Sequence, residues 1–334
     1  MDRMNIVYAT DDNYAMITGI SMISLFENNR QCDDLDIYIL SDNISDLNRK
    51  KLYGIGQRYQ RKVQIIDVME ALLNFQQRGA SGYANENGSG YSSYAKLLIS
   101  DILCEIERII YLDSDTLVLG DISCLMNLNM HGKPIGMAHD CLQSRYKRFI
   151  NLTEGTGYYN SGMLIYDMAT WKERKCSERI IEHIIKVRNV YPLPDQDLIN
   201  VVLHDDIYKI DAKYNYLSQY YLYSYSNIKK VYELKNISEF YTEDRFPNSD
   251  EAVILHFCGQ TFIRPWYRNS KHPAKQMYDK YYKLSPWRDE PQKNCKWSLQ
   301  YLVQYLLWKY MPESVAAVCG KIMQRLFMRI TYKV

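Results

Sequence analysis

The sequence predicts an α/β protein with a single Rossmann-like, mostly parallel central sheet, flanking helices and a helical C-terminal extension. Two observations carry this prediction. Short apolar runs rich in Ile, Val, Leu and Tyr alternate with stretches of helical length, the pattern of βαβ units. Acidic pairs follow directly on two of these runs, at 11–12 and at 113–115, where open parallel sheets bind their ligands.

The first third of the chain predicts strand–helix units. Each unit joins a short apolar strand to a helix of about 10–15 residues, and a stretch rich in Gly, Ser, Asn and Tyr then reads as a mobile loop. In chain order we expect strand 5–10, helix 14–28, strand 35–40, helix 45–60, strand 63–66, helix 67–77, loop 79–91 and helix 92–104. This order predicts parallel pairing of the strands.

The rest of the main domain contains one clear strand pattern, followed by a less regular series of predicted strands and helices. The run Ile109-Ile110-Tyr111-Leu112 is typical of a buried strand, and it leads straight into acidic residues. Beyond it we expect strands at 134–138 and 158–166, helices near 169–189 and 195–204, and a last buried strand at 252–257.

Length and charge indicate the domain organisation. A chain of 334 residues corresponds to about two domains. The net charge of +2 hides a division, because the chain from Arg264 onward carries 14 basic and 4 acidic residues. A basic tail therefore follows an acidic body. We expect a main domain at 1–265 and a basic, aromatic-rich helical extension at 266–334.

Composition narrows the class and the compartment. Hydrophobic residues make up 47% and charged residues 24%, which excludes a disordered chain. The eight cysteines are scattered, with no C-x-x-C pair, as in proteins of a reducing cytosol. No signal-peptide pattern and no uncharged apolar stretch of 18 residues is present, so we expect a cytoplasmic protein. Tyr supplies 31 residues, and its amphipathic ring suits sugars, wet interfaces and lipid headgroups; compositional drift explains the excess equally well.

Asp113 and Asp115 are the sharpest chemical feature. Residues i and i+2 of an extended segment point to the same side, so two carboxylates gather at a strand end. Such oxygen ligands suit Mg²⁺ or Mn²⁺. His256 ends another buried strand, and an imidazole ligand favours Mn²⁺. The alternatives are a solvated Asp turn and a core histidine bonded to a carbonyl.

Two further polar segments stand out. Asp195-Gln196-Asp197 follows a Pro-Leu-Pro sequence, and a capped helix N-terminus explains the two aspartates but not Gln196. Asn160-Ser161-Gly162 interrupts a strand pattern, and a turn or bulge is its simplest explanation. The chain lacks G-x-G-x-x-G, the P-loop and G-x-S-x-G, which disfavours dinucleotide dehydrogenases, P-loop enzymes and α/β-hydrolases.

Taken together, these segments resemble the family-8 retaining glycosyltransferases, which include bacterial lipo-oligosaccharide galactosyltransferases and glycogenin. The resemblance covers residues 5 to about 266 and rests on an ordered set of short segments. They are Tyr8-Ala-Thr-Asp-Asp-Asn-Tyr14, Tyr94-Ala-Lys-Leu97, Tyr111-Leu-Asp-Ser-Asp115, Tyr159-Asn-Ser-Gly-Met-Leu164, Asp195-Gln-Asp-Leu-Ile-Asn200 and His256-Phe-Cys-Gly259. The resemblance implies a GT-A catalytic domain and a UDP-galactose or UDP-glucose donor.

The family pattern also implies roles for individual residues. The expected nucleotide-binding residues are Ala9, Asp11, Asn13, Tyr14, Ser114, Gly259 and Arg264, with Tyr14 stacking on the uracil. Asp113, Asp115 and His256 would hold Mn²⁺, with Mg²⁺ as the alternative, and the cation would clamp the diphosphate. The expected donor-sugar residues are Lys96, Asn160, Asp195 and Gln196, and Asp140 would orient the acceptor.

The resemblance implies transfer with retention of configuration. Gln196 matches the position under the anomeric carbon, and an amide is a poor nucleophile, so we favour front-face attack with Asp195 as the carboxylate to test. The family usually reads His-x-x-Gly-x-x-Lys-Pro-Trp. Here two residues are inserted before Arg264-Pro265-Trp266 and Arg replaces Lys, which leaves the geometry of this loop open.

The tail suggests attachment to a surface. Aromatic and apolar residues recur at helical spacing over 297–311 and again after Pro312, and Lys321, Arg325 and Arg329 form a basic stripe. This pattern suits an anionic membrane, and packing on the main domain or dimerisation are the alternatives. We expect a peripheral protein on the inner face of the cell membrane, a lipid-linked glycan acceptor and no nucleic-acid partner.

Three other functions stay open at this point. A glycogenin-like protein would glycosylate one of its own tyrosines. A catalytically silent sugar-nucleotide-binding protein would keep the fold without turnover, although the intact Asp113, Asp115 and His256 argue against it. A nucleotidyltransferase is disfavoured because its Gly-rich basic first loop is absent.

Overall fold

The structure is a computed structural model that describes residues 3–80, 92–153, 155–187, 191–234, 246–259 and 262–332. The chain forms two compact units. The first consists of Met1–Ala138 and Tyr159–Ile210, and the second of His139–Tyr158 and Asp211–Val334. The expected division into a main domain at 1–265 and an extension at 266–334 stays a prediction.

A seven-stranded sheet forms the centre of the first unit, in the order β3-β2-β1-β4-β7-β6-β8. The pairs β1–β2, β1–β4, β2–β3 and β6–β8 are parallel, whereas β4 and β7 are antiparallel. The predicted mostly parallel sheet is therefore confirmed. The strands are β1 (Met4–Asp11), β2 (Leu35–Asp42), β3 (Lys62–Asp67), β4 (Arg108–Asp113), β6 (Ile135–His139), β7 (Tyr159–Asp167) and β8 (Ile207–Ile210).

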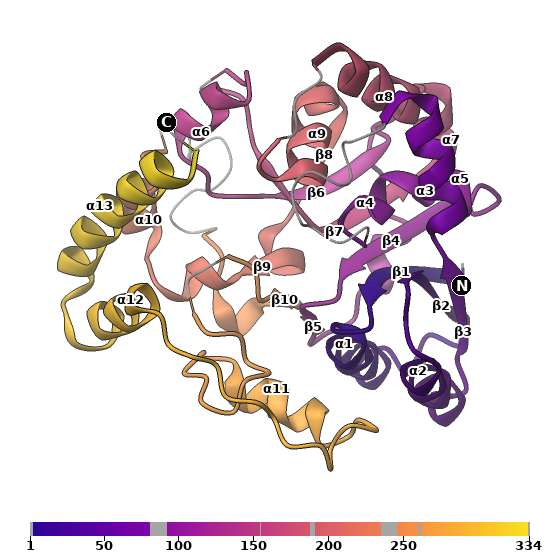
Figure 1. The fold of residues 1–334 in the computed structure, drawn as a ribbon, viewed down its shortest axis with the longest axis horizontal. Coiled ribbons are helices and arrows are strands. Elements are labelled where there is room, and N and C mark those ends of the chain that lie inside the picture. The colour runs from indigo at the N-terminus through magenta and orange to yellow at the C-terminus, as the bar shows by residue number, and fades with distance from the viewer. Residues whose placement is uncertain are drawn as a thin grey trace. The chain divides into compact units, whose positions relative to one another are not determined.

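Helices cover both faces of this sheet. Figure 1 shows α1 and α2 on one side of the strands and α7 and α8 on the other. The helical segments of this unit are α1 (Ala15–Asn28), α2 (Asp46–Tyr59), α3 (Met69–Phe75), η1 (Gln76–Ala80), α4 (Ser92–Ala95), η2 (Lys96–Leu98), α5 (Ile99–Ile102), α7 (Met168–Glu173), α8 (Cys176–Val187) and α9 (Pro194–Val202). The Ser45 hydroxyl caps α2 by accepting a hydrogen bond from the Asn48 N–H.

The helices differ from the sequence prediction in two places. The helix expected at 92–104 is divided into α4, η2 and α5, so Lys96 begins a 3₁₀ turn. The helix expected at 169–189 is divided into α7 and α8, because Lys175 between them takes a left-handed conformation with φ of 52°. The loop expected at 79–91 lies outside the described residues, apart from Gly79 and Ala80 at the end of η1.

The second unit is mostly helical around a short parallel pair of strands. The last predicted strand is confirmed but is shorter than expected, since β10 covers only Ile254–His256 and pairs with β9 (Tyr216–Leu217). The other elements of this unit are α6 (Ser144–Phe149), η5 (Ala212–Asn215), η6 (Ser218–Tyr221), α10 (Tyr225–Val231), η9 (Ser249–Glu251), α11 (Lys275–Tyr282), α12 (Leu299–Tyr310) and α13 (Glu313–Tyr332).

The last helix packs along α10, as Figure 1 shows. Gly320 permits close contact, because a Cβ at that position would collide with the Tyr223 hydroxyl. Glu233 forms ion pairs with Lys321, at 3.2 Å between Oε1 and Nζ, and with Arg325. The hydrogen bonds from Arg325 hold the pKa of Glu233 at about 2. Lys321 and Arg325, two of the three residues of the predicted basic stripe, therefore form ion pairs within their own unit.

The opposite face of α13 is apolar and exposed. Its outward residues Val315, Val318, Ile322, Leu326 and Ile330 recur every three or four positions. Among the described residues, no helix has both the length and the apolar character needed to cross a membrane.

Candidate active site

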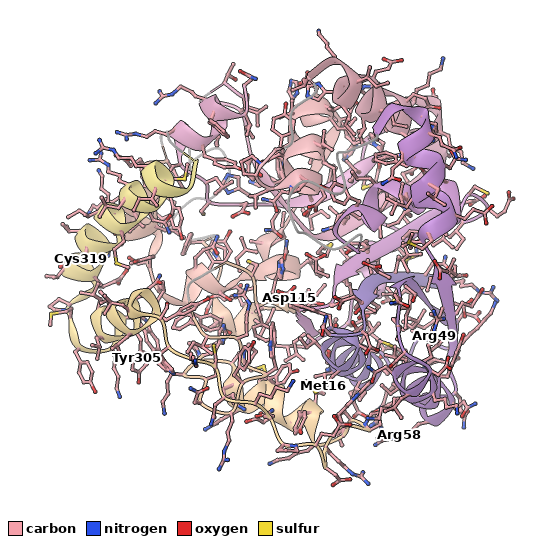
Figure 2. All side chains as sticks on the ribbon, in the orientation of Figure 1. Met16, Arg49, Arg58, Asp115, Tyr305 and Cys319 are labelled. Carbon is pink, nitrogen blue, oxygen red and sulfur yellow. The ribbon has the colours of Figure 1, made fainter. Side chains whose placement is uncertain are left out.

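The end of β4 carries the predicted pair of carboxylates. Parallel pairing sets Asp113 beside Ala9, at the end of β1. The buried Ser114 hydroxyl donates to the Ala9 carbonyl at 2.9 Å and accepts from the Thr18 hydroxyl at 2.8 Å. These bonds fix the turn that presents Asp115, which Figure 2 marks beyond the strand. Ser114 therefore contributes to the site by a hydrogen bond to the backbone of β1.

Asp113 belongs to a network of charged groups. Its Oδ1 accepts hydrogen bonds from the Tyr111 hydroxyl at 2.8 Å and from Lys96 Nζ at 3.1 Å. Burial and the Asp113 carboxylate raise the pKa of Tyr111 well above its usual value, so its hydroxyl keeps the proton that it donates. The sequence pattern did not identify Tyr111, although alternation within β4 puts it on the same side as Asp113.

Lys96 joins two carboxylates. Its side chain is only 5% exposed, and Nζ lies 2.8 Å from Asp195 Oδ2 and 3.1 Å from Asp113 Oδ1. Burial by itself would lower the pKa of Lys96, but the attraction of Asp113 and Asp195 outweighs it and the pKa is raised. With Asp115 at the same strand end, three carboxylates and one ammonium leave this region negatively charged, as a cation site requires.

The start of α9 completes this network through Ser161. The Ser161 hydroxyl donates to Asp195 Oδ2 at 2.8 Å, and the backbone N–H of Ser161 donates to Gln196 Oε1 at 3.0 Å. Lys96 Nζ also lies 3.2 Å from the Ser161 carbonyl oxygen. Ser161 was not among the predicted site residues, although Asn160-Ser161-Gly162 had marked the position. Asn160 Oδ1 accepts from the Gly162 N–H at 2.9 Å, which shapes the strand locally.

The neighbouring aspartate has the simpler role that helix capping predicts. Asp197 Oδ2 accepts a hydrogen bond from the Leu193 N–H at 2.9 Å. Asn200 ties the same helix to β7, because its amide donates to the Tyr159 carbonyl and accepts from the Tyr159 N–H, both at 2.8 Å. Capping therefore explains Asp197, whereas Asp195 and Gln196 face Lys96 and Ser161.

The loop between β1 and α1 presents the predicted uridine residues. Asp11 Oδ1 accepts from the Tyr14 N–H at 2.9 Å, and Asp11 Oδ2 accepts from the Asn13 amide at 3.3 Å. The Tyr14 ring is 43% exposed at the start of α1. This turn has an ordered backbone and an aromatic face, the features that stacking on a base requires.

His256 lies in the second unit, where hydrogen bonds orient it. Its buried ring has Nδ1 3.0 Å from Asn215 Oδ1, an acceptor, so Nδ1 carries the proton and Nε2 has the lone pair. The Ser218 hydroxyl donates to the His256 carbonyl at 3.2 Å and lies 3.2 Å from His272 Nε2. His272 accepts the Ala274 N–H at its Nδ1, at 3.0 Å.

The other predicted residues of the second unit are also anchored. Asp140 Oδ1 accepts from the Gln219 amide at 3.2 Å. Gly259 takes a positive φ of 71°, and the Arg264 guanidinium donates to its carbonyl and lies 6.0 Å from the Trp266 ring centre. Residues 260–261 lie outside the described chain, so the effect of the inserted residues on the role of Arg264 stays a prediction.

The family model of "Glycosyl transferase family 8" matches residues 5–270. The chain belongs to glycosyltransferase family 8. The resemblance inferred from the short segments is confirmed.

The chain is also similar in sequence or structure to known proteins. General stress protein A of Bacillus subtilis is 28% identical over 85% of this chain and 94% of its own length. Lipopolysaccharide 1,2-glucosyltransferase of Escherichia coli is 25% identical over 95% of this chain and 89% of its own length. The crystal structure of the galactosyltransferase LgtC, in complex with donor and acceptor sugar analogues, has a TM-score of 0.67 at 19% identity. The match covers 90% of this chain and 100% of LgtC, and this likeness shows the GT-A fold.

Proposed function

We propose that this family-8 glycosyltransferase moves a hexose, galactose or glucose, from a UDP-sugar to a saccharide acceptor with retention of configuration. The observation that carries the proposal is the buried ammonium of Lys96 between Asp113 and Asp195, joined through Ser161 to Gln196. Such a preorganised polar cluster at the carboxyl end of parallel strands suits a polyhydroxylated, phosphate-bearing donor.

The donor nucleotide would bind at the ends of β1 and β4. Tyr14 offers an exposed ring for the uracil, and Asp11, Asn13 and the backbone of Ala9 offer polar groups for the ribose and base. Ser114 would contribute by holding Ala9 in place. Gly259 and Arg264 are proposed to reach the diphosphate, since a guanidinium binds phosphate oxygens bidentately.

The donor set of Asp113, Asp115 and His256 fits a divalent cation. Two carboxylates and a neutral imidazole suit Mn²⁺, and Mg²⁺ is the alternative. The orientation of two of these ligands, Asp113 and His256, supports this assignment. Tyr111 and Lys96 fix Asp113, and Asn215 fixes the tautomer of His256 with its lone pair on Nε2. When bound, the cation would neutralise charge on the departing diphosphate.

The sugar would be held by Lys96, Asn160, Asp195 and Gln196. In the proposed step, the bond between the anomeric carbon and the phosphate oxygen breaks, and the acceptor oxygen forms the new bond from the same face. The acceptor proton moves to the phosphate oxygen that leaves. Gln196 would stabilise positive charge at the anomeric carbon, and Asp140 would orient the acceptor hydroxyl. Asp195 is held by Lys96 and Ser161, so it suits positioning better than nucleophilic attack.

The acceptor is proposed to be a lipid-linked surface glycan, reached from the inner face of the cell membrane. The relatives that act on lipopolysaccharide support this, as does the exposed apolar stripe of α13 beside basic residues. The double substitution Val318→Asp with Ile322→Asp should reduce sedimentation with phosphatidylglycerol vesicles. The matched control is Leu47→Asp with Leu73→Asp, two leucines of similar exposure on the first unit. Equal sedimentation of both variants would refute this attachment.

The proposed activity is tested by a donor-hydrolysis screen over UDP-galactose, UDP-glucose and UDP-N-acetylglucosamine with Mn²⁺. We expect metal-dependent release of UDP from a hexose donor, abolished by Asp113→Asn and retained by Asp205→Asn, an exposed aspartate of the same unit. Absence of release from every donor would support a silent sugar-nucleotide-binding protein. A hexose adduct on the protein, found by mass spectrometry with donor alone, would indicate self-glycosylation instead.

A further inference from the structure

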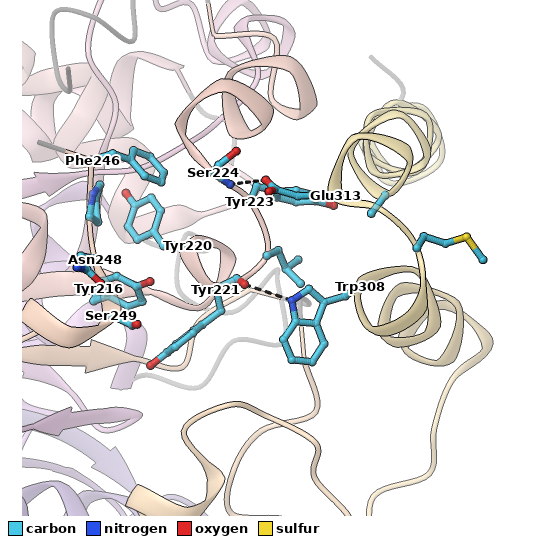
Figure 3. Close-up of a pocket in the computed structure, with 14 residues that line it drawn as sticks. Tyr216, Tyr220, Tyr221, Tyr223, Ser224, Phe246, Asn248, Ser249, Trp308 and Glu313 are labelled. Atoms are coloured by element: carbon cyan, nitrogen blue, oxygen red, sulfur yellow. Dashed lines mark hydrogen bonds between the residues drawn. The ribbon is translucent and has the colours of Figure 1, made fainter. Parts of the chain in front are cut away.

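An aromatic pocket lies within the second unit, apart from the residues assigned above. Its volume is about 500 Å³, which is typical of small-molecule sites. It opens between the segments around η6 and η9 on one side and the C-terminal helices α12 and α13 on the other (Figure 3). Among the described residues, the rings that line it are those of Tyr216, Tyr220, Tyr221, Tyr223, Phe246 and Trp308.

Hydrogen bonds join the walls of this pocket. The Trp308 indole N–H on α12 donates to the Tyr221 carbonyl at 3.3 Å. The Glu313 carboxylate at the start of α13 accepts from the Asn227 amide at 2.9 Å and from the Ser224 N–H. Figure 3 shows the bonds from Trp308 to Tyr221 and from Ser224 to Glu313 as dashed lines. The pocket is therefore preformed, which lowers the entropic cost of binding a ligand.

The chemistry of the lining favours a saccharide. Aromatic rings offer flat faces for the apolar C–H face of a pyranose, and polar groups at the rim offer partners for its hydroxyls. Asn248, Ser249 and Glu313 supply those polar groups, and all three are exposed. An acyl chain would gain nothing from them and would leave their hydrogen bonds to water. Four of the 31 tyrosines of the chain lie in this pocket.

The turn η6 connects this pocket to the proposed acceptor residue. Gln219 in the middle of the turn donates to Asp140 Oδ1 at 3.2 Å. Its neighbours Tyr220 and Tyr221 line the pocket, and the Tyr220 hydroxyl donates to the His139 carbonyl at 3.2 Å. One short turn therefore carries both a contact to Asp140 and a wall of the pocket.

We propose that this pocket is a second saccharide subsite, which holds sugar units of the acceptor glycan beyond the unit that receives the hexose. The proposal rests on the proposed function for its acceptor class. It assigns to α12 and α13 a role in binding the glycan, because Trp308 and Glu313 form one side of the pocket.

The test is saturation-transfer-difference NMR of the full chain with maltotriose and with lactose. Both sugars should bind, because stacking on aromatic faces tolerates different pyranoses. The expected dissociation constants are in the millimolar range. Ser249→Trp, at the exposed rim, should weaken both by about tenfold or more because the added ring fills the pocket. The matched control is Glu251→Trp, an exposed residue at the other end of η9, which should bind both sugars like the unmodified chain.

Two outcomes would overturn the proposal. One is no saturation transfer to either sugar, and the other is equal affinity in Ser249→Trp and Glu251→Trp. Sodium octanoate is the acyl probe, and its binding in place of the sugars would equally contradict a saccharide subsite. UDP release from the donor is measured on the same samples. Release without sugar binding would refute this inference alone, whereas absence of release would refute the proposed function.

Discussion

Lys96 in the first unit and His272 in the second are both buried bases, yet their charges differ. Burial favours the neutral form of each. Ion pairs with Asp113 and Asp195 outweigh that effect at Lys96 and raise its pKa. His272 is packed against aromatic rings, and its ring centre lies 5.1 Å from that of Phe257 and 5.0 Å from that of Phe262. Burial, with the positive charge of Arg264 nearby, lowers the pKa of His272 to about 3.

The difference shows how each unit is built for its proposed part of the reaction. The first unit keeps charges inside by pairing them, which suits a donor with a diphosphate and a cation. The second unit orients His256 and Asp140 through neutral groups, namely Asn215, Ser218 and Gln219. Removing the buried charge of Lys96 should therefore have a larger effect than removing a neutral hydrogen bond, and removing a partly exposed charge should have the smallest effect.

The largest effect is expected for Lys96→Met. It removes the counter-charge of Asp113 and Asp195, and breaking a buried ion pair costs about 3 kcal/mol. Urea denaturation measures the loss, with Lys62→Met, an exposed lysine on β3, as the control. Because the pKa of Lys96 is raised, its contribution is complete below the ordinary lysine pKa and is lost only as pH rises through the raised value. Equal stability of the two variants would contradict the assigned role of the cluster.

A smaller effect on turnover is expected for Gln196→Ala. Loss of an electrostatic stabiliser of the transition state should lower kcat by about 100-fold. The affinity for UDP, measured by calorimetry, should change less than twofold, because the proposed uridine residues lie elsewhere on the loop at 11–14. A parallel loss of UDP affinity and kcat would instead make Gln196 a general support of the fold.

Asn215→Leu removes a neutral hydrogen bond of the second unit. Without the amide acceptor, Nδ1 of His256 loses the partner that fixes the tautomer, and Mn²⁺ affinity should fall by about tenfold. Free Mn²⁺ by electron paramagnetic resonance gives the affinity, and ¹⁵N NMR of the imidazole reports the tautomer directly. Asn215→Asp keeps an acceptor and should restore both readouts. An unchanged tautomer in Asn215→Leu would show that other groups orient His256.

Glu233→Gln should have the smallest effect. The ion pairs with Lys321 and Arg325 are partly exposed, so their contribution to the free energy of unfolding is small. Since the pKa of Glu233 is lowered to about 2, this contribution is present above the ordinary Glu pKa and disappears as pH falls through the lowered value. Hydrogen exchange along α13 at neutral and acid pH measures it, with Glu251→Gln as the control. Faster exchange at both pH values would point to a cause other than these ion pairs.

The features that the sequence could predict are those that depend on local pattern. The alternation of apolar strands and helices placed the parallel sheet, and the acidic ends of two strands marked the carboxylates, because both depend on local pattern. Tyr111 and Ser161 were missed, since both contact Lys96, which reaches them from a separate segment of the chain. The aromatic pocket was missed for the same reason, because rings from residues 216–223 meet Trp308 on α12 only after folding.

The breaks in the helices were also beyond local pattern. Lys175 takes a left-handed conformation that few non-glycine residues adopt, and the apolar spacing of the two flanking helices does not reveal it. The neutral hydrogen bonds around His256 likewise join residues 215, 218 and 272, whose spacing carries no signal in the chain.

Retaining transfer from a UDP-hexose can be tested by ¹H NMR of the hexose that is first released from UDP-galactose or UDP-glucose. We expect the α anomer to appear first and Asp113→Asn to abolish its release. Initial release of the β anomer, or release that persists in Asp113→Asn, would contradict it.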